Sequence, residues 1–314
     1  MLQIKDYQKN DEKMILNLFK KSFNQDLNYE EWKWNYNDNI YSDKYIKLMW
    51  DLDTLAGHYS ILPTQMKIYN KFYKTGLSLA TMTSPEYKNQ GIFVKLAKAL
   101  YEENYNKLTI IYGFPNNNSL HGFIKYLGWH HISDIPIYSC YTYQLNSSYI
   151  DKNIKQVSNL DERVDILFKD FSQNYPVIIH RNKQYIDWRY KSNPKNKYYY
   201  IVYEDGNNYL GYCIYKLFKS ENNYFCDLVD IMAKTNHIYT KLLLYLINLM
   251  NSKSIKYINS WFTNKDQLDI AKNLGFKSTN IITHFGFKIN CDFINLKDIN
   301  FEKWYLTMGD SDVF

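Results

Sequence analysis

The sequence has few cysteines, few arginines and no long apolar run. The four cysteines are Cys140, Cys213, Cys226 and Cys291, and no two lie close enough in sequence for a metal-ligand pair. This spacing argues against a zinc site and predicts reduced thiols. No segment approaches the ~18 consecutive apolar residues of a membrane span, and the N-terminal segment has no apolar signal-peptide core. We therefore expect a cytoplasmic protein without membrane insertion.

The rest of the composition is that of a globular protein. Hydrophobic residues make up 46% of the 314 residues and charged residues 22%, which is enough for a large core and about two domains. Tyr, Asn, Lys and Ile are abundant, and AT-rich codon usage explains this without a nucleic-acid stacking surface. The net charge of +6 is spread along the chain, which favours a solvated surface with a mild attraction for anionic small molecules. A nucleic-acid partner is not expected.

Hydrophobic periodicity predicts helices and strands in an order that repeats. In the first half, helices are expected at 11–23, 29–36 and 91–104, and strands at 45–50, 55–62, 64–69, 77–83 and 108–114. In the second half, helices are expected at 161–171, 185–190 and 237–250, and strands at 198–205, 210–218, 224–232 and 256–262. Each half ends with a short helix followed by Leu-Gly and an aromatic residue.

Two pairs of segments support a tandem repeat. EEWKWNYNDN (30–39) resembles YIDWRYKSNP (185–194), and NNNSLHGFIKYLGW (116–129) resembles TNKDQLDIAKNLGF (263–276). The second pair places Asn117 on Asn264 and Gly128 on Gly275. We predict two domains, 1–150 and 151–314, with the aromatic C-terminal tail docked on the second.

The stretch SPEYKNQGIFVKL (84–96) carries a polar turn between a strand and an amphipathic helix. The first N–H groups of a helix have no intrahelical partners, and the helix dipole adds partial positive charge there. Gly91 permits close approach of an anion, and Lys88 adds a mobile cation. Alone, the turn fits either a phosphate site or an ordinary strand–helix connection.

The surrounding segments extend the pattern. A strand ending in GFPNNNS, a short helix and LGW follow the turn, and residues 75–132 as a whole resemble the GCN5-related N-acetyltransferase (GNAT) family. The family's loop, Q/R-x-x-G-x-G/A, falls on residues 88–93. The resemblance implies an α/β fold with a mixed sheet, built of two GNAT-like repeats, each a mostly antiparallel sheet flanked by helices.

The resemblance also implies a site for acetyl-CoA or another acyl-CoA, with no metal. Met82 and Thr83 would end the strand that pairs with the pantetheine, and Asn117 would lie beside the pantetheine arm. The pyrophosphate would be cradled by the turn, whose residues are Lys88, Asn89, Gln90, Gly91, Ile92 and Phe93.

The sequence departs from the family in two places. Phe93 stands where Gly or Ala is usual, and Ile124 stands where a Tyr often protonates the leaving thiolate. In the second half, no glycine follows the strand at 224–232, so we expect that half to bind no CoA.

Direct attack by an amine needs a proton acceptor but no nucleophilic cysteine. The candidates for proton transfer are His58, His121 and Tyr126. Each has a structural alternative: His58 as a packed strand residue, His121 as a surface residue and Tyr126 as a core residue. Glu86 follows the strand, but the phosphates of a bound acyl-CoA would repel its carboxylate.

Charged residues of the second half form another candidate group. Arg181 and Arg189 are two of only three arginines, and Asp310 and Asp312 lie in the tail. They are candidates for binding an anionic or ammonium-bearing acceptor. The alternatives are a buried ion pair with Asp187 and a purely structural tail.

These features favour transfer of an acetyl group from acetyl-CoA directly to a primary amine of a small molecule. An amino sugar or sugar nucleotide of surface polysaccharide synthesis is the acceptor class that the resemblance suggests. Two other readings remain open: an aminoacyl-tRNA-dependent transferase of related tandem architecture, and a non-catalytic acyl-CoA-binding module.

Overall fold

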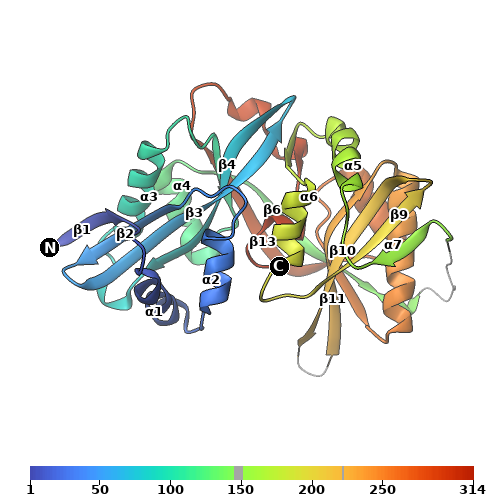
Figure 1. The fold of residues 1–314 in the computed structure, drawn as a ribbon, viewed down its shortest axis with the longest axis horizontal. Helices are drawn as coiled ribbons and strands as arrows, with labels where there is room; N and C mark the ends of the chain where they lie inside the picture. The colour runs from blue at the N-terminus through green and yellow to red at the C-terminus, as the bar shows by residue number, and fades with distance from the viewer. Residues whose placement is uncertain (145–150, 221–222) are drawn as a thin grey trace. The chain divides into compact units, whose positions relative to one another are not determined.

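The computed structural model describes residues 1–144, 151–220 and 223–314, and the chain divides into two compact units (Figure 1). Unit 1 comprises Met1–Met66, Phe72–Ser133 and His284–Asp298, and unit 2 comprises Lys67–Lys71, Asp134–Thr283 and Ile299–Phe314. The expected boundary at residue 150 lies outside the described residues. The units also differ from the expected contiguous domains, because residues 284–298 belong with the N-terminal unit.

Unit 1 is a mixed sheet with helices on both faces. Its strands lie in the order β1-β2-β3-β4-β5-β13. The elements are β1 (Leu2–Asp6), α1 (Glu12–Phe23), α2 (Tyr29–Tyr36), β2 (Tyr45–Asp51), β3 (Thr54–Ile68), β4 (Lys71–Thr83), α3 (Ile92–Glu103), β5 (Ile110–Gly113), α4 (Asn117–Leu127) and the end of β13 (Lys277–Ile289).

Two helix pairs cover opposite faces of this sheet. Ile15 and Trp32, from α1 and α2, pack with Leu48 of β2 in one buried cluster. Leu96 of α3 and Phe123 of α4 pack in a separate cluster, which takes the next residue of β2, Met49. Successive strand residues point to opposite faces, so the alternation along β2 sorts the helices onto the two sides.

A late segment of the chain completes the sheet of unit 1. The end of β13 pairs antiparallel with β5, with Gly286 opposite Gly113 and Ile289 opposite Ile110. The strand β6 (His130–Tyr141) begins in unit 1 and continues into unit 2. There it pairs antiparallel with Tyr257–Ser260. Each unit therefore contains a strand from the other half of the sequence.

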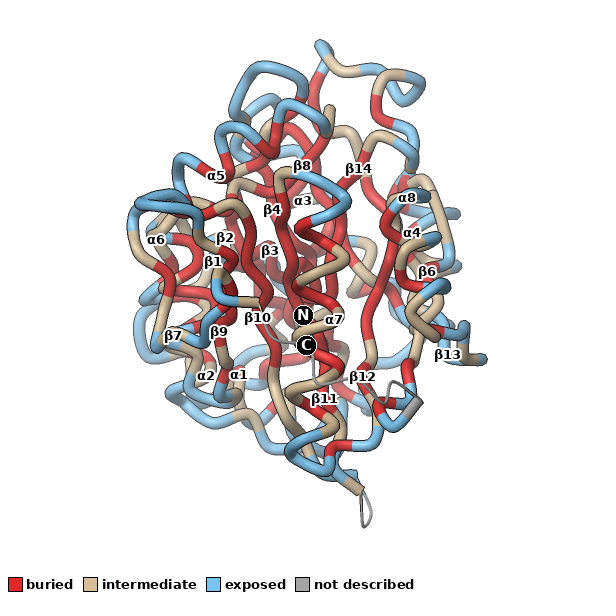
Figure 2. The backbone as a smooth tube through the Cα atoms, turned by 90° about the vertical axis from the view of Figure 1, so that its right-hand side faces the viewer, coloured by how far each residue is buried: buried red, intermediate tan, exposed pale blue. Residues whose placement is uncertain are grey.

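The strands of unit 2 lie in the order β6-β12-β11-β10-β9-β7. Its elements are β7 (Ile154–Val157), α5 (Arg163–Phe171), β8 (Val177–Ile179), α6 (Lys183–Ile186), β9 (Tyr198–Asp205), β10 (Asn208–Ser220), β11 (Asn223–Ala233), α7 (Asn236–Ser252), β12 (Tyr257–Ser260), α8 (Lys265–Asn273) and β14 (Trp304–Tyr305). The apolar face of α7 packs on this sheet. Figure 2 shows β3 buried along most of its length. β10 is buried mainly from Gly211 to Tyr215.

Most expected elements are present, with one merger. The segments expected as strands at 55–62 and 64–69 form the single strand β3. Pro63 lies within β3. Proline fits the extended backbone of a strand, although it cannot donate a hydrogen bond to the ladder. No helix in the described ranges is long and apolar enough to span a membrane. All four cysteines are free and buried.

Candidate functional site

Helix α3 begins directly after the turn that follows β4, and no side chain caps its first N–H groups. Gly91 is the N-cap of α3, with φ of 70°, and no side chain caps the helix. By contrast, the Asn116 side chain caps α4 by accepting hydrogen bonds from the N–H groups of Asn118 and Ser119. The leading N–H groups of α3 therefore have neither intrahelical nor side-chain partners. Uncapped N–H groups at a helix start can bind an anion, and anion binding at this turn stays a prediction.

The residues around Gly91 are accessible. Lys88, Asn89, Gln90 and Gly91 are exposed. A Cβ at Gly91 would meet no atom within 4 Å, so glycine is needed there for its positive φ and not for space.

Beside this turn, the sheet of unit 1 opens. β4 and β5 pair in parallel at Gly76–Ile111 and Leu77–Tyr112. Among the described residues, the ladder stops there, while β4 continues to Thr83. The segment 78–83 thus presents backbone groups without a strand partner on its β5 side. An extended ligand can pair with such an edge as an added strand.

A backbone irregularity lies within this open segment. Ala80 has φ of 50°, a value that L residues other than Asn and Asp rarely adopt. Two buried side chains of β3 hold the distortion: Ser60 donates its hydroxyl to the Leu79 carbonyl at 3.0 Å, and His58 Nδ1 lies 2.7 Å from the Ala80 carbonyl. Sequence reasoning missed Ser60 and Ala80, because nothing in the run GLSLATMT marks a residue with positive φ.

His58 is fully buried within unit 1. Its Nδ1 must carry the proton to donate to the Ala80 carbonyl, which leaves the lone pair on Nε2. Nε2 has no hydrogen-bond partner among the described residues. Burial lowers the pKa of His58 to about 4. His58 is therefore neutral at pH 7 and a weak base, and its geometry is that of a residue that holds β4 in shape.

Phe93 occupies a packed position at the start of α3. Its ring lies 4.9 Å from that of Phe123 and 6.1 Å from that of Tyr59. A Cβ on Gly122 would come within 2.9 Å of the Phe93 ring. The large side chain of Phe93, where the family usually has Gly or Ala, is thus accommodated by Gly122 on α4. The neighbouring Ile92 is buried.

The start of α4 brings Asn117 to a histidine distant in sequence. Asn117 Oδ1 lies 2.6 Å from Nε2 of His284, on β13. Because Asn116 serves as the cap, the Asn117 side chain is left for this contact. His284 was not singled out from the sequence, and no local signal could have found it, since β13 joins unit 1 from far along the chain.

The other proton-transfer candidates lie on the exposed face of α4. His121 and Tyr126 are exposed, with ring centroids 6.1 Å apart in an edge-on arrangement. Tyr126 is 49% exposed, so the alternative that it is a core residue is wrong. Tyr126 directly precedes the buried Leu127, and neighbouring residues of a helix face different directions. Their catalytic roles stay predictions.

At the end of β4, Met82 is buried and Thr83 is partly exposed. Glu86 accepts a hydrogen bond from the Ser84 hydroxyl, which lowers the pKa of its carboxyl group. A lowered pKa makes Glu86 a poorer base.

The charged candidates of the second half form a buried network within unit 2. Arg181 is fully buried, with Nε 3.0 Å from Asp230 and Nη2 2.7 Å from Asp310. Its Nη1 donates to the Ile179 carbonyl. Asp187 pairs instead with Lys183. In this conformation, every guanidinium nitrogen of Arg181 donates a hydrogen bond to a protein oxygen.

Arg189 is bonded to the C-terminal tail. Its Nε donates to the Gly309 carbonyl at 2.9 Å, and its Nη2 donates to the carbonyls of Ser311 and Phe314. Asp312 is exposed. A role in acceptor binding for Arg189 and Asp312 stays a prediction, and the observed hydrogen bonds of Arg189 anchor the tail.

The N-terminal segment is similar to a known family. Residues 3–132 match the family described as acetyltransferase (GNAT) domain. No curated protein matches the chain.

Solved structures match nearly the whole chain. A GCN5-related N-acetyltransferase from Anabaena variabilis has a TM-score of 0.72 at 14% identity, covering 92% of this chain and 73% of that one. A conserved protein of unknown function from Enterococcus faecalis, a probable N-acyltransferase, has a TM-score of 0.73 at 17% identity, with coverages of 92% and 72%. A GCN5-related N-acetyltransferase from Kribbella flavida gives 0.71 at 12%, with 92% and 71%. At these identities the likeness shows the fold.

Proposed function

We propose, on the premise that residues 3–132 match the acetyltransferase (GNAT) domain family, that the protein transfers an acetyl group from acetyl-CoA to a primary amine of a small molecule. The acceptor class we propose is an amino sugar or sugar nucleotide, and the place of action is the cytoplasm. The observation that carries the proposal is the open edge of β4 beside the uncapped start of α3.

The residues of this edge suit an acyl-CoA. The first N–H groups of α3 would bind the pyrophosphate, with Gly91 allowing its approach. The segment 78–83 would pair with the pantetheine arm. The bound thioester supplies an activated acyl group, and a β4 N–H donated to its carbonyl oxygen would stabilise the oxyanion as the amine attacks.

The distortion at Ala80 gives this edge a fixed shape. A backbone donor is useful only if it is held in place before the reaction. Ser60 and His58 hold the two neighbouring carbonyls of β4. We therefore assign them a positioning role for the backbone that receives the thioester.

Calorimetric titration with acetyl-CoA tests the donor site, using the wild type and two variants. Gly91→Asp places a negative charge at the turn, and about tenfold or greater loss of affinity is expected. Gly206→Asp is the matched control, because Gly206 also has positive φ, 57°, and open space around it. It reproduces the backbone strain elsewhere in the chain and should bind as the wild type does.

The outcomes separate the readings. If the wild type fails to bind acetyl-CoA, or if both variants bind equally well, the donor site is not at this turn. Salt-sensitive binding of aminoacyl-tRNA would then support the tRNA-dependent alternative. Once binding is established, release of free CoA in the presence of amino-sugar nucleotides measures transfer. Binding without release for any amine would leave the binding-module reading.

A further inference from the structure

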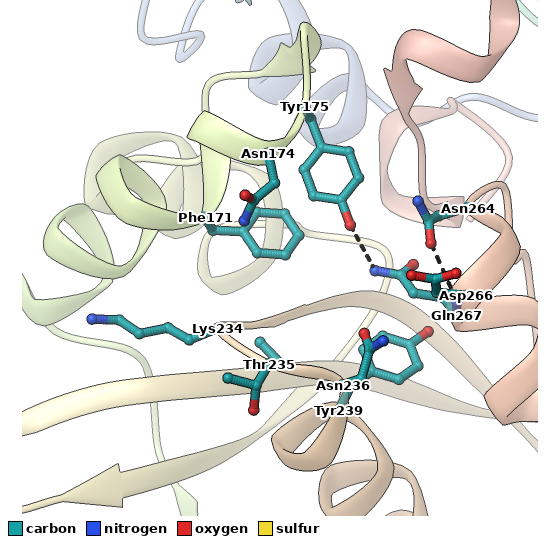
Figure 3. A pocket seen from close by; sticks show the side chains of 11 residues that line it. Phe171, Asn174, Tyr175, Lys234, Thr235, Asn236, Tyr239, Asn264, Asp266 and Gln267 are labelled. Atoms are coloured by element: carbon teal, nitrogen blue, oxygen red, sulfur yellow. Dashed lines mark hydrogen bonds between the residues drawn. The ribbon is translucent and has the colours of Figure 1, made fainter.

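Unit 2 contains a pocket that the donor turn does not explain. It has a volume of about 260 Å³ and lies where the end of β11 meets the first turns of α7 and α8 (Figure 3). The short helical turn after α5 forms its remaining wall, with Phe171 and Tyr175. All of these residues belong to one unit.

The pocket is poorly suited to an anion. Unlike α3, both helices carry side-chain caps: Thr235 accepts from the N–H of Ile238, and Asn264 accepts from the N–H of Gln267. The lysine of the lining, Lys234, is paired with Asp170 at 2.6 Å. Asp266, in the first turn of α8, adds a negative charge to the lining. Helix dipoles that would attract phosphate are thus offset by capping and by a carboxylate.

The lining is suited to a ligand rich in hydroxyl groups. Asn174, Asn236, Asn264 and Gln267 contribute side-chain amides. An amide both donates and accepts hydrogen bonds, as a sugar hydroxyl does. Gln267 is already oriented, since its Nε2 donates to the Tyr175 hydroxyl at 3.2 Å.

Aromatic rings complete the wall. Phe171 and Tyr175 lie with ring centroids 4.8 Å apart, and Tyr305 packs against both from the C-terminal tail. These rings lie behind a lining whose accessible surface is mainly polar. Among the described residues, the pocket thus presents side-chain amides that can fix the orientation of a polar ligand.

Tyr239 of α7 carries an unsatisfied polar group at this pocket. It lines the pocket and is 2% exposed, yet its hydroxyl has no hydrogen-bond partner in the described part of the chain. A buried hydroxyl without a partner costs stability. The hydroxyl oxygen is itself buried, so a ligand hydroxyl removes that cost when the lining side chains shift to admit it.

We propose that this pocket binds a neutral monosaccharide unit. Its volume lies just below the ~300–1,000 Å³ of pockets for drug-sized ligands, which fits one sugar ring. The inference does not rest on the acyl-transfer function, because the donor turn lies in unit 1 and this pocket in unit 2.

The test is titration of the full chain by calorimetry with glucose, galactose and N-acetylglucosamine, and with inorganic phosphate at matched ionic strength. Binding of at least one sugar and none of phosphate is expected. Tyr239→Phe should weaken sugar binding about tenfold. Asn236→Ala, at an exposed side chain, should weaken it without disturbing the fold.

Tyr200→Phe is the matched control. Tyr200 also carries a buried hydroxyl without a partner among the described residues, but it lies on β9, outside the pocket lining. This variant should bind sugar as the wild type does. The proposal is overturned if no sugar binds, if phosphate binds in competition with the sugar, or if Tyr239→Phe and Asn236→Ala both retain wild-type affinity.

Discussion

The buried His58 links one side chain to the acid stability of the protein. Burial lowers its pKa to about 4, whereas an unfolded chain has the ordinary value of about 6.5. Between these values the unfolded state binds more protons, so stability is complete above pH ~6.5 and is lost as the pH falls toward 4.

We expect His58 to account for a loss on the order of 2 kcal/mol between pH 7 and pH 5. Urea denaturation at both pH values measures it. The His58→Gln variant keeps a donor for the Ala80 carbonyl but cannot be protonated, so its loss should be smaller by about that amount. Equal losses in the wild type and the variant would contradict the assignment.

Arg181 gives a second prediction at the residue scale. Its guanidinium is buried between Asp230 and Asp310, and removing one partner of a buried ion pair typically costs about 3–5 kcal/mol. Arg181→Met should therefore destabilise unit 2 by about this amount in urea denaturation. Arg181→Lys should rescue little of it, because an ammonium cannot form the guanidinium's several directed bonds. A stable variant with a raised KM for the amine would instead favour a role in acceptor binding.

At the scale of elements, Phe93 at the start of α3 forms part of the contact between α3 and α4. Phe93 packs on Phe123 at 4.9 Å and against Gly122. Phe93→Ala should destabilise unit 1 by about 2 kcal/mol, less than a fully buried Phe, because Phe93 is only partly buried.

A double-mutant cycle of Phe93→Ala with Phe123→Leu should give a coupling energy of about 1 kcal/mol. Additive effects would mean that the two rings do not interact. Acetyl-CoA affinity of Phe93→Ala, measured alongside, reports whether this packing also sets the position of the turn.

Local patterns predicted most elements because their causes are local. Helix α1 follows from its apolar spacing. Helix α2 buries Trp32, Trp34 and Tyr36 at every second residue, and its local signal is the Asn28 cap at its start. The turn before α3 follows from Gly91 after a strand. The repeat alignment, however, set Asn117 on Asn264, whereas the helix caps are Asn116 and Asn264. A shift of one residue changes which side chain faces a ligand, and similarity of sequence alone did not resolve it.

The features that sequence could not supply depend on distant partners. Ala80 adopts positive φ because Ser60 and His58 bind its neighbourhood from β3. His284 reaches Asn117 only because β13 pairs with β5. Strand partners are chosen over long sequence separations, and periodicity within a strand does not specify them.

For the whole molecule, the division into units predicts which fragments fold. A fragment of residues 1–150 contains β5 but lacks its antiparallel partner in β13. An unpaired edge beside an incomplete core promotes aggregation. We expect this fragment to aggregate, and a fusion of 1–133 through a flexible linker to 284–298 to fold cooperatively, as followed by thermal denaturation.

The fused fragment also locates the donor site. If acetyl-CoA binds within unit 1, the fusion should bind it with an affinity near that of the full chain. Cooperative folding of the unfused 1–150 fragment would show that β13 is dispensable for unit 1.

The position of β13 in the chain also fixes the order of events at the ribosome. The N-terminal half emerges first, but β5 cannot pair with β13 until the segment 286–289 has been synthesised, close to the end of the 314 residues. At ~5–20 residues per second, the edge of β5 stays open for roughly ten to thirty seconds while unit 2 is synthesised. During that interval neighbouring nascent chains compete for the edge, so the yield of folded protein should depend on translation speed and on chaperones that shield it.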